Sequence, residues 1–189
     1  MLLVRHAGTP GMRRACFPAR EHADPASLIR AAALMLGTGP RTKAFAAPVP
    51  AAMATAEALG LVPTVTAELA DADYGRWSGL PYGEVAAADP ESFAAWLGDP
   101  HAAPHGGESR AAMSARVVRW LESTPRGQDV VAFCDAGPIR AVLGHVLGLT
   151  DGARALFDLV PLSVTKVTAT RDGWRVAYVN RVAPTRRAS

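Results

Sequence analysis

The sequence has few of the features that mark secreted, membrane-spanning or disulfide-stabilised proteins. It contains two cysteines, Cys16 and Cys134, so far apart that we expect no disulfide framework and a reducing compartment. No run of about eighteen apolar residues occurs, and charge follows the short apolar start at once, so we expect neither a signal peptide nor a membrane span. These absences predict a soluble, cytoplasmic protein.

Basic and aromatic clusters are equally scarce. The formal net charge is +3, and the last nine residues carry all of it through Arg181, Arg186 and Arg187. The body is therefore formally neutral, and no basic helix or aromatic ladder suggests a nucleic-acid or membrane partner. We expect one domain over residues 1–180, a flexible basic tail over 181–189, and a small-molecule ligand. A homodimer stays open.

What the sequence does have is a regular alternation of strand and helix patterns. Strands are expected at 2–4, 43–47 and 130–134, and a hairpin at 163–170 and 174–179 around the turn dipeptide Asp172-Gly173. Helices are expected at 25–36, 50–61, 82–88 and 90–97. Two more are expected, one that begins after the cap Ser109 and one that ends at Gly148. The pattern predicts a three-layer α/β sandwich with a mostly parallel sheet, an antiparallel edge strand and helices on both faces.

Two chemically capable residues follow predicted strands directly. His6 comes after the first strand and Asp135 after the strand 130–134. Because ligands of open α/β sheets bind at the carboxyl ends of the strands, these two side chains are candidates for one site. Cys134 precedes Asp135 and should point to the opposite face, where a buried apolar role is expected.

Five sequence blocks in order carry a family resemblance. They are LVRHAGT at 3–9, APVPAAMATA at 47–56, LADADYGRWSG at 69–79, GGES at 106–109 and the segment 130–140. Together they resemble the histidine phosphatase superfamily, in the branch that includes the cofactor-dependent phosphoglycerate mutases. The resemblance implies the α/β fold and phosphoryl transfer through a phosphohistidine.

The resemblance also implies roles for individual residues. His6 would be the nucleophile, Arg5 a clamp on the phosphate oxygens and Asp71 the proton donor, where the family usually has Glu. Thr9 could donate a further hydrogen bond, and the loop residues Gly107, Glu108 and Ser109 would help to bind substrate, with specificity set by the middle section 72–109. No cofactor or metal is implied, and His101 and His105 are expected in a loop and not at a zinc site.

Two positions depart from the family pattern. The second phosphate-binding Arg falls on Ala51 and the second catalytic His on Asp135. At about 4 Å and an effective dielectric near 20, one like-charge contact costs on the order of 4 kcal/mol, and Asp135 could relieve part of that by binding a proton. Three hypotheses follow: a weakened phosphatase or mutase, a His6/Asp135 general-base enzyme acting on a neutral or cationic ligand, and an inactive pseudophosphatase.

Overall fold

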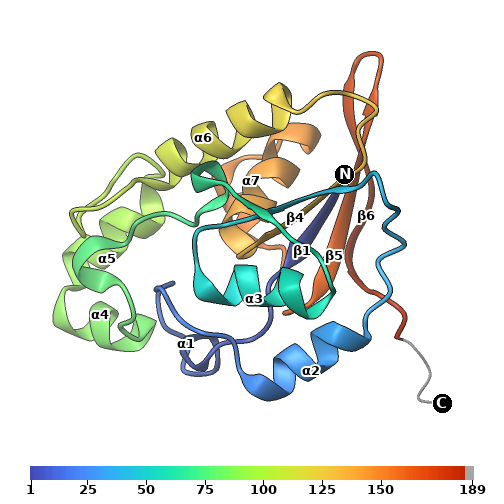
Figure 1. Cartoon of the computed structure of the whole chain (residues 1–189). Helices are drawn as coiled ribbons and strands as arrows, with labels where there is room; N and C mark the ends of the chain where they lie inside the picture. The colour runs from blue at the N-terminus through green and yellow to red at the C-terminus, as the bar shows by residue number, and fades with distance from the viewer. Residues whose placement is uncertain (186–189) are drawn as a thin grey trace.

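A computed structural model describes residues 1–185, which form one six-stranded mixed sheet with helices on both faces (Figure 1). The strand order is β3-β2-β4-β1-β5-β6. The four strands from β3 to β1 run parallel, while β5 is antiparallel to β1 and β6 to β5. The strands are β1 (Leu2–Arg5), β2 (Lys43–Ala46), β3 (Thr64–Val65), β4 (Val130–Cys134), β5 (Ser163–Thr170) and β6 (Gly173–Val182). The predicted fold class is confirmed.

The helices form the two outer layers. On one side α3 packs on β2, β4 and α2, and on the other α7 packs on β1, β6 and α6 (Figure 1). Helices α4 and α5 lie together at one end of the molecule, away from the sheet. The α-helices are α1 (Pro10–Arg13), α2 (Pro25–Ala33), α3 (Pro50–Ala58), α4 (Tyr82–Ala88), α5 (Pro90–Gly98), α6 (Arg110–Ser123), α7 (Ala136–Leu147) and α8 (Asp151–Ala155), with 3₁₀ turns at Ala67–Leu69 and Gly75–Trp77.

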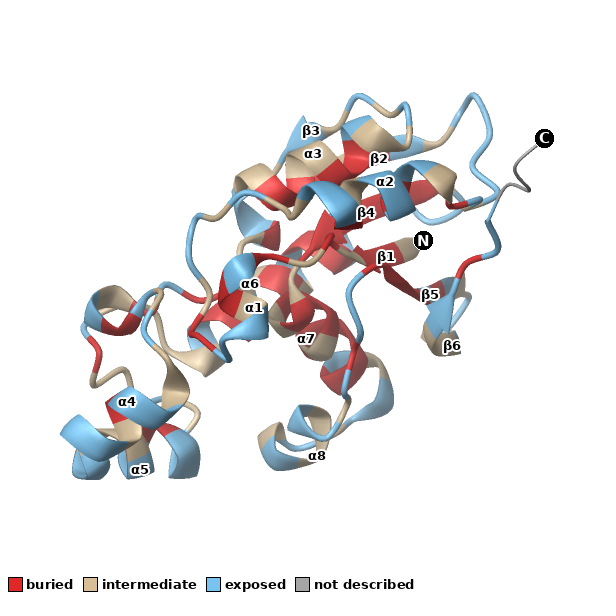
Figure 2. Ribbon diagram, turned by 90° about the horizontal axis from the view of Figure 1, so that it is seen from below, coloured by how far each residue is buried: buried red, intermediate tan, exposed pale blue. Residues whose placement is uncertain are grey.

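The central strand β4 is buried along its whole length, as its uninterrupted apolar run predicts (Figure 2). Local signals also set the ends of its neighbours. The Ser109 hydroxyl accepts a hydrogen bond from the Ala112 N–H at the start of α6, and Gly148 ends α7 in the left-handed conformation. The sheet and its adjoining helices therefore follow from patterns that can be read along the chain.

Tertiary contacts shift several expected boundaries. Helix α2 ends at Ala33, three residues early, because Leu34 is extended and pairs with Thr185. Strand β6 continues to Val182, so the tail expected from residue 181 begins inside the sheet, and Ala183 is buried. The rest of that tail, 186–189, lies outside the described residues. Within 1–185 no helix combines the length and apolar character needed to cross a membrane.

A cluster of aromatic residues packs the middle section against the first loop. Phe17 lies with its ring centroid 4.2–5.3 Å from those of Tyr74, Trp77, Tyr82 and Trp96. Such tilted and edge-on pairs add to the stability that burial gives. These side chains fix the segment that carries Asp71 relative to the sheet.

Candidate active site

The register of β1 and β4 brings His6 and Asp135 together. Arg5 pairs with Cys134, and the His6 N–H donates to the Cys134 carbonyl at 2.9 Å, so the next residue of each strand enters the same site. The Nε2 atom of His6 lies 3.8 Å from Oδ2 of Asp135. The expected meeting of these side chains at the strand ends is present in the structure.

The His6 ring is oriented by its own backbone. Its Nδ1 lies 2.8 Å from the Ala7 carbonyl, which can only accept, so Nδ1 carries the proton and Nε2 holds the lone pair in the neutral ring. The loop that supplies this carbonyl is held by Thr55, whose hydroxyl accepts from the Ala7 N–H at 2.9 Å. His6 is 4% exposed, and Nε2 is its edge toward Asp135. The ring is therefore fixed with the nitrogen that holds the lone pair facing the site.

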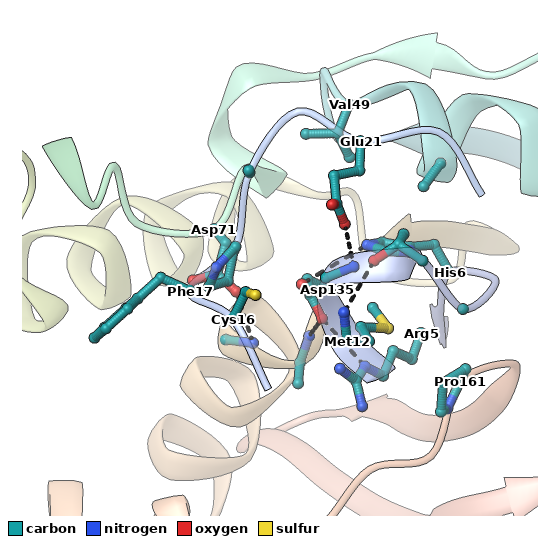
Figure 3. Close-up of a pocket in the computed structure, with 18 of the residues that line it drawn as sticks. Arg5, His6, Met12, Cys16, Phe17, Glu21, Val49, Asp71, Asp135 and Pro161 are labelled. Carbon is teal, nitrogen blue, oxygen red and sulfur yellow. Dashed lines mark hydrogen bonds and ion pairs between the residues drawn. The ribbon is translucent and has the colours of Figure 1, made fainter. Parts of the chain in front are cut away.

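Arg5 is engaged by Asp135. Its Nε donates to Oδ1 of Asp135 at 3.1 Å (Figure 3), and its Nη1 donates to the Leu159 carbonyl. The same Oδ1 accepts the Ala136 N–H at 2.7 Å, at the start of α7. The Arg5 guanidinium thus already has a carboxylate partner inside the protein.

The two buried aspartates have opposite pKa shifts. Burial, followed by the negative charge of Asp135, raises the pKa of Asp71 to about 6. Burial also acts to raise the pKa of Asp135, but interactions with His6 and Arg5 and the Ala136 N–H outweigh it, so that pKa is lowered. Without a bound anion, Asp135 is therefore the more acidic of the two, and Asp71 is the carboxyl whose pKa lies closer to neutral pH. The uptake of a proton by Asp135 beside a bound phosphate stays a prediction.

Asp71 is held at the start of α7. Its Oδ2 accepts the Gly137 N–H at 3.2 Å, and its Oδ1 accepts the Ala72 N–H at 2.7 Å and the Tyr74 hydroxyl at 3.4 Å. A side-chain Cβ at Gly137 would lie 2.4 Å from the Asp71 carboxylate, so only glycine permits this approach. Asp71 and Asp135 consequently accept hydrogen bonds from the backbone N–H groups of two adjacent residues, Gly137 and Ala136, at the N-terminus of α7.

These residues line a cavity of about 540 Å³ at the strand ends. Ala51 lies in its wall, and Glu21 enters beside Val49 (Figure 3). Its charged lining residues besides His6 are Arg5, Arg13, Arg30 and Arg140, and Glu21, Asp24, Asp71, Asp135 and Asp158. Four positive charges against five negative ones leave a formal charge of −1, so the cavity is not the cationic basin that a phosphate dianion favours.

The other predicted site residues divide between the cavity and the scaffold. Thr9 lines the cavity, and its hydroxyl accepts the Met12 N–H at 3.4 Å. Gly107, Glu108 and Ser109 do not line it: Gly107 packs against the Asp73 carbonyl, Glu108 pairs with Arg116, and Ser109 caps α6. In the structure these three residues hold the middle section together.

Arg116 was missed by the sequence analysis. Its Nη1 donates to the carbonyls of Ala67, Glu68 and Ala70 at 2.8–3.1 Å, and its Nη2 binds Glu108 at 2.6 Å. It thereby gathers the segment that leads into Asp71. Nothing in the spacing of α6 marks Arg116, because its partners are carbonyl groups some 46–49 residues earlier.

The alternative chemistries considered for cysteine and histidine find no geometric support. Cys134 is fully buried, and burial raises its thiol pKa well above the ordinary value. His105 is buried beside Tyr74 and Trp77, and its Nδ1 accepts the Gly107 N–H. Within the described residues, no group of three or more His, Cys, Asp or Glu side chains is placed to hold a metal ion.

A histidine held at a strand end lies beside an arginine and an aspartate with a raised pKa, and residues 1–182 match the histidine phosphatase superfamily (branch 1). The chain belongs to this superfamily. It is 33% identical over 123 residues to a bifunctional protein of Mycobacterium tuberculosis, a match that covers 62% of this chain and 34% of the relative. It is 37% identical over 104 residues to a glucosyl-3-phosphoglycerate phosphatase of the same organism, covering 49% of this chain and 47% of the relative. The matches thus span a third to a half of these relatives.

Solved structures share the fold over nearly the whole chain. The native mycobacterial glucosyl-3-phosphoglycerate phosphatase superposes with a TM-score of 0.78 at 25% identity, covering 95% of this chain and 97% of that one. A putative alpha-ribazole-5'-P phosphatase from Escherichia coli superposes with a TM-score of 0.85 at 20% identity, covering 96% of both chains. The second likeness shows the fold alone.

Proposed function

We propose that this protein is a slow phosphomonoester hydrolase that acts through a phosphohistidine at His6. The observation that carries the proposal is the ordered His6 ring with Nε2 facing the cavity while Arg5 is paired with Asp135. The first half of that arrangement supports catalysis, and the second half weakens it. A structure of the mycobacterial relative holds inorganic phosphate, which supports a phosphate ester as the substrate class.

The nucleophile and the proton donor are in place. Displacement at phosphorus needs a nucleophile with a lone pair aimed at the phosphoryl group and an acid for the leaving alkoxide. His6 supplies the first through Nε2. Asp71 supplies the second, because a pKa of about 6 leaves roughly a tenth of the carboxyl protonated at pH 7.

The site has less positive charge for binding a phosphate group than the family pattern provides. Ala51 and Asp135 stand where the family pattern has an arginine and a histidine, which removes one positive charge and adds one negative charge. Arg5 also donates its Nε to Asp135 and its Nη1 to the Leu159 carbonyl, so part of its guanidinium is engaged before a phosphate binds. Since phosphoryl transfer depends on stabilising the charge of three oxygens, we infer a rate far below that of a site with the full set.

A second candidate function rests on the His6–Asp135 contact of 3.8 Å. The carboxylate beside Nε2 would stabilise the imidazolium that forms when Nε2 takes up a proton as a general base, and this would suit a neutral or cationic substrate better than a phosphate. This candidate requires no covalent intermediate, and that separates the two mechanisms.

The test is hydrolysis of an aryl phosphate combined with acid-free trapping of the phosphoenzyme. We expect slow release of phosphate, an acid-labile phosphoenzyme, and loss of both in His6→Ala. Thr64→Ala, an exposed change on the edge strand β3 outside the cavity lining, is the matched control and should retain the rate. Turnover that survives in His6→Ala would overturn the proposal, and absence of phosphoenzyme together with absence of turnover would leave the pseudophosphatase as the better description.

A further inference from the structure

A second cavity adjoins the one that contains His6. It has a volume of about 140 Å³ and lies among α6, α7, α8 and the aromatic residues of the middle section. Tyr74, Tyr82, Gly137 and Arg140 line both cavities. The two cavities therefore share these four residues as a common wall.

The second cavity is cationic. Three arginines line it, Arg110, Arg140 and Arg154, against the single carboxylate of Asp151. The formal charge is thus +2, whereas the neighbouring cavity carries −1. The cavity around His6 lacks positive charge, and the adjoining cavity has it.

Asp151 neutralises the cluster only in part. Its Oδ1 accepts from Nη2 of Arg154, and its Oδ2 lies 3.8 Å from Nε of Arg110. Arg140 donates its Nε to the Phe157 carbonyl at 2.9 Å, and within residues 1–185 its two terminal nitrogens make no hydrogen bond or ion pair. At least one guanidinium edge therefore remains for an anion.

The walls fix the arginines in place. The Arg110 guanidinium lies 5.2 Å from the ring centroid of Trp96, and the side chains of Arg110 and Arg154 are only 18% and 14% exposed. Like charges in a partly desolvated space repel, and an anion placed between them removes that cost. Burial is the main cause that lowers the pKa of Arg154; Asp151 acts against it and Arg110 adds to it.

We propose that the cavity formed by Arg110, Arg140, Arg154 and Trp96 binds the anionic group of a small ligand, a carboxylate or a phosphate. Its volume is several times the roughly 30 Å³ that a water occupies in the liquid, so one such group fits. The planar guanidinium groups suit two-point contact with either anion. The remainder of the ligand extends past Arg140 toward His6. This site does not depend on turnover at His6.

The experiment follows the Trp96 indole N–H signal by NMR while inorganic phosphate, or malonate as the carboxylate probe, is added at constant ionic strength. Trp96→Phe assigns the signal among the four tryptophans. We expect a saturable shift in the wild type and in His6→Ala, and at least about tenfold weaker binding in Arg154→Gln and in Arg110→Gln. Tighter binding of one probe identifies the anion class.

Arg126→Gln is the matched control, because this exposed arginine binds the carbonyls of Thr170 and Arg171 outside both cavities. It should bind as the wild type does. Arg110→Lys keeps the charge and should retain more affinity than Arg110→Gln, which guards against loss by misfolding. A shift that disappears in His6→Ala but persists in both glutamine variants, or no saturable shift with either probe, would overturn the proposal.

Discussion

Nε of Arg5 lies 3.1 Å from Oδ1 of Asp135, so the arginine at the end of β1 is neutralised by the aspartate at the end of β4. The pair is only slightly exposed, with 17% and 14% of the two side chains accessible. Because one carboxylate oxygen also accepts the Ala136 N–H, the Asp135 side chain is held on both sides. The site is arranged around this internal ion pair.

Restoring the cationic clamp should raise phosphatase activity. We expect Ala51→Arg with Asp135→His to increase kcat/KM for an aryl phosphate by two to three orders of magnitude, roughly the 4 kcal/mol of one relieved like-charge contact. The uncharged counterpart, Ala51→Gln with Asp135→Asn, should lie between this variant and the wild type. Steady-state kinetics check the order, and equal rates in all three proteins would contradict the charge argument.

Removing the Asp135 charge should lower the pKa of Asp71. The Asp135 charge is the second-largest cause of that raised pKa after burial, so in Asp135→Asn the pKa should fall below about 6 yet stay above 3.8. Carbon-detected NMR titration of the Asp71 carboxyl measures it. Asp24→Asn changes another cavity-lining aspartate that does not contribute to the shift, and it should leave the titration unchanged.

Residual hydrolysis should increase as the solution becomes more acidic. The proton donor must be protonated to act, and Asp71 gains its proton as pH falls through about 6, while the lowered pKa of Asp135 keeps that group ionised. We expect kcat/KM to rise about tenfold per unit from about pH 8 toward pH 6. In Asp71→Asn the rise of kcat/KM toward acidic pH should be absent. If the rise persists, a group other than Asp71 causes it.

Gly107 should be needed for folding because its backbone is in close contact with a neighbouring loop. A Cβ added there would lie 2.1 Å from the Asp73 carbonyl oxygen, a contact that only a backbone movement relieves. Thermal or urea unfolding of Gly107→Ala should show a loss of about 2 kcal/mol or more. Gly83→Ala, with open space around the new methyl group in α4, should be neutral or stabilising by up to about 1 kcal/mol.

The sequence predicts the sheet and the neighbourhood of the site because both depend on backbone patterns. The buried run of β4 and the position of His6 after β1 place the two strand ends side by side whatever the rotamers. The pairing of Arg5 with Asp135 and the reach of Arg116 to Ala67 depend on side-chain directions between distant segments. The raised pKa of Asp71 depends on burial, which no local pattern records.

In the Arg5–Asp135 pair, a carboxylate of the protein itself competes with a substrate anion for the Arg5 guanidinium. A carboxylate attached to the chain stays at an effective concentration far above the millimolar range, whereas a substrate reaches the same guanidinium only by diffusion. A phosphate ester that takes the Nε edge of Arg5 must displace this resident anion. A compound that supplies an additional contact in the adjoining arginine-lined cavity would have the advantage in that exchange over a bare phosphate.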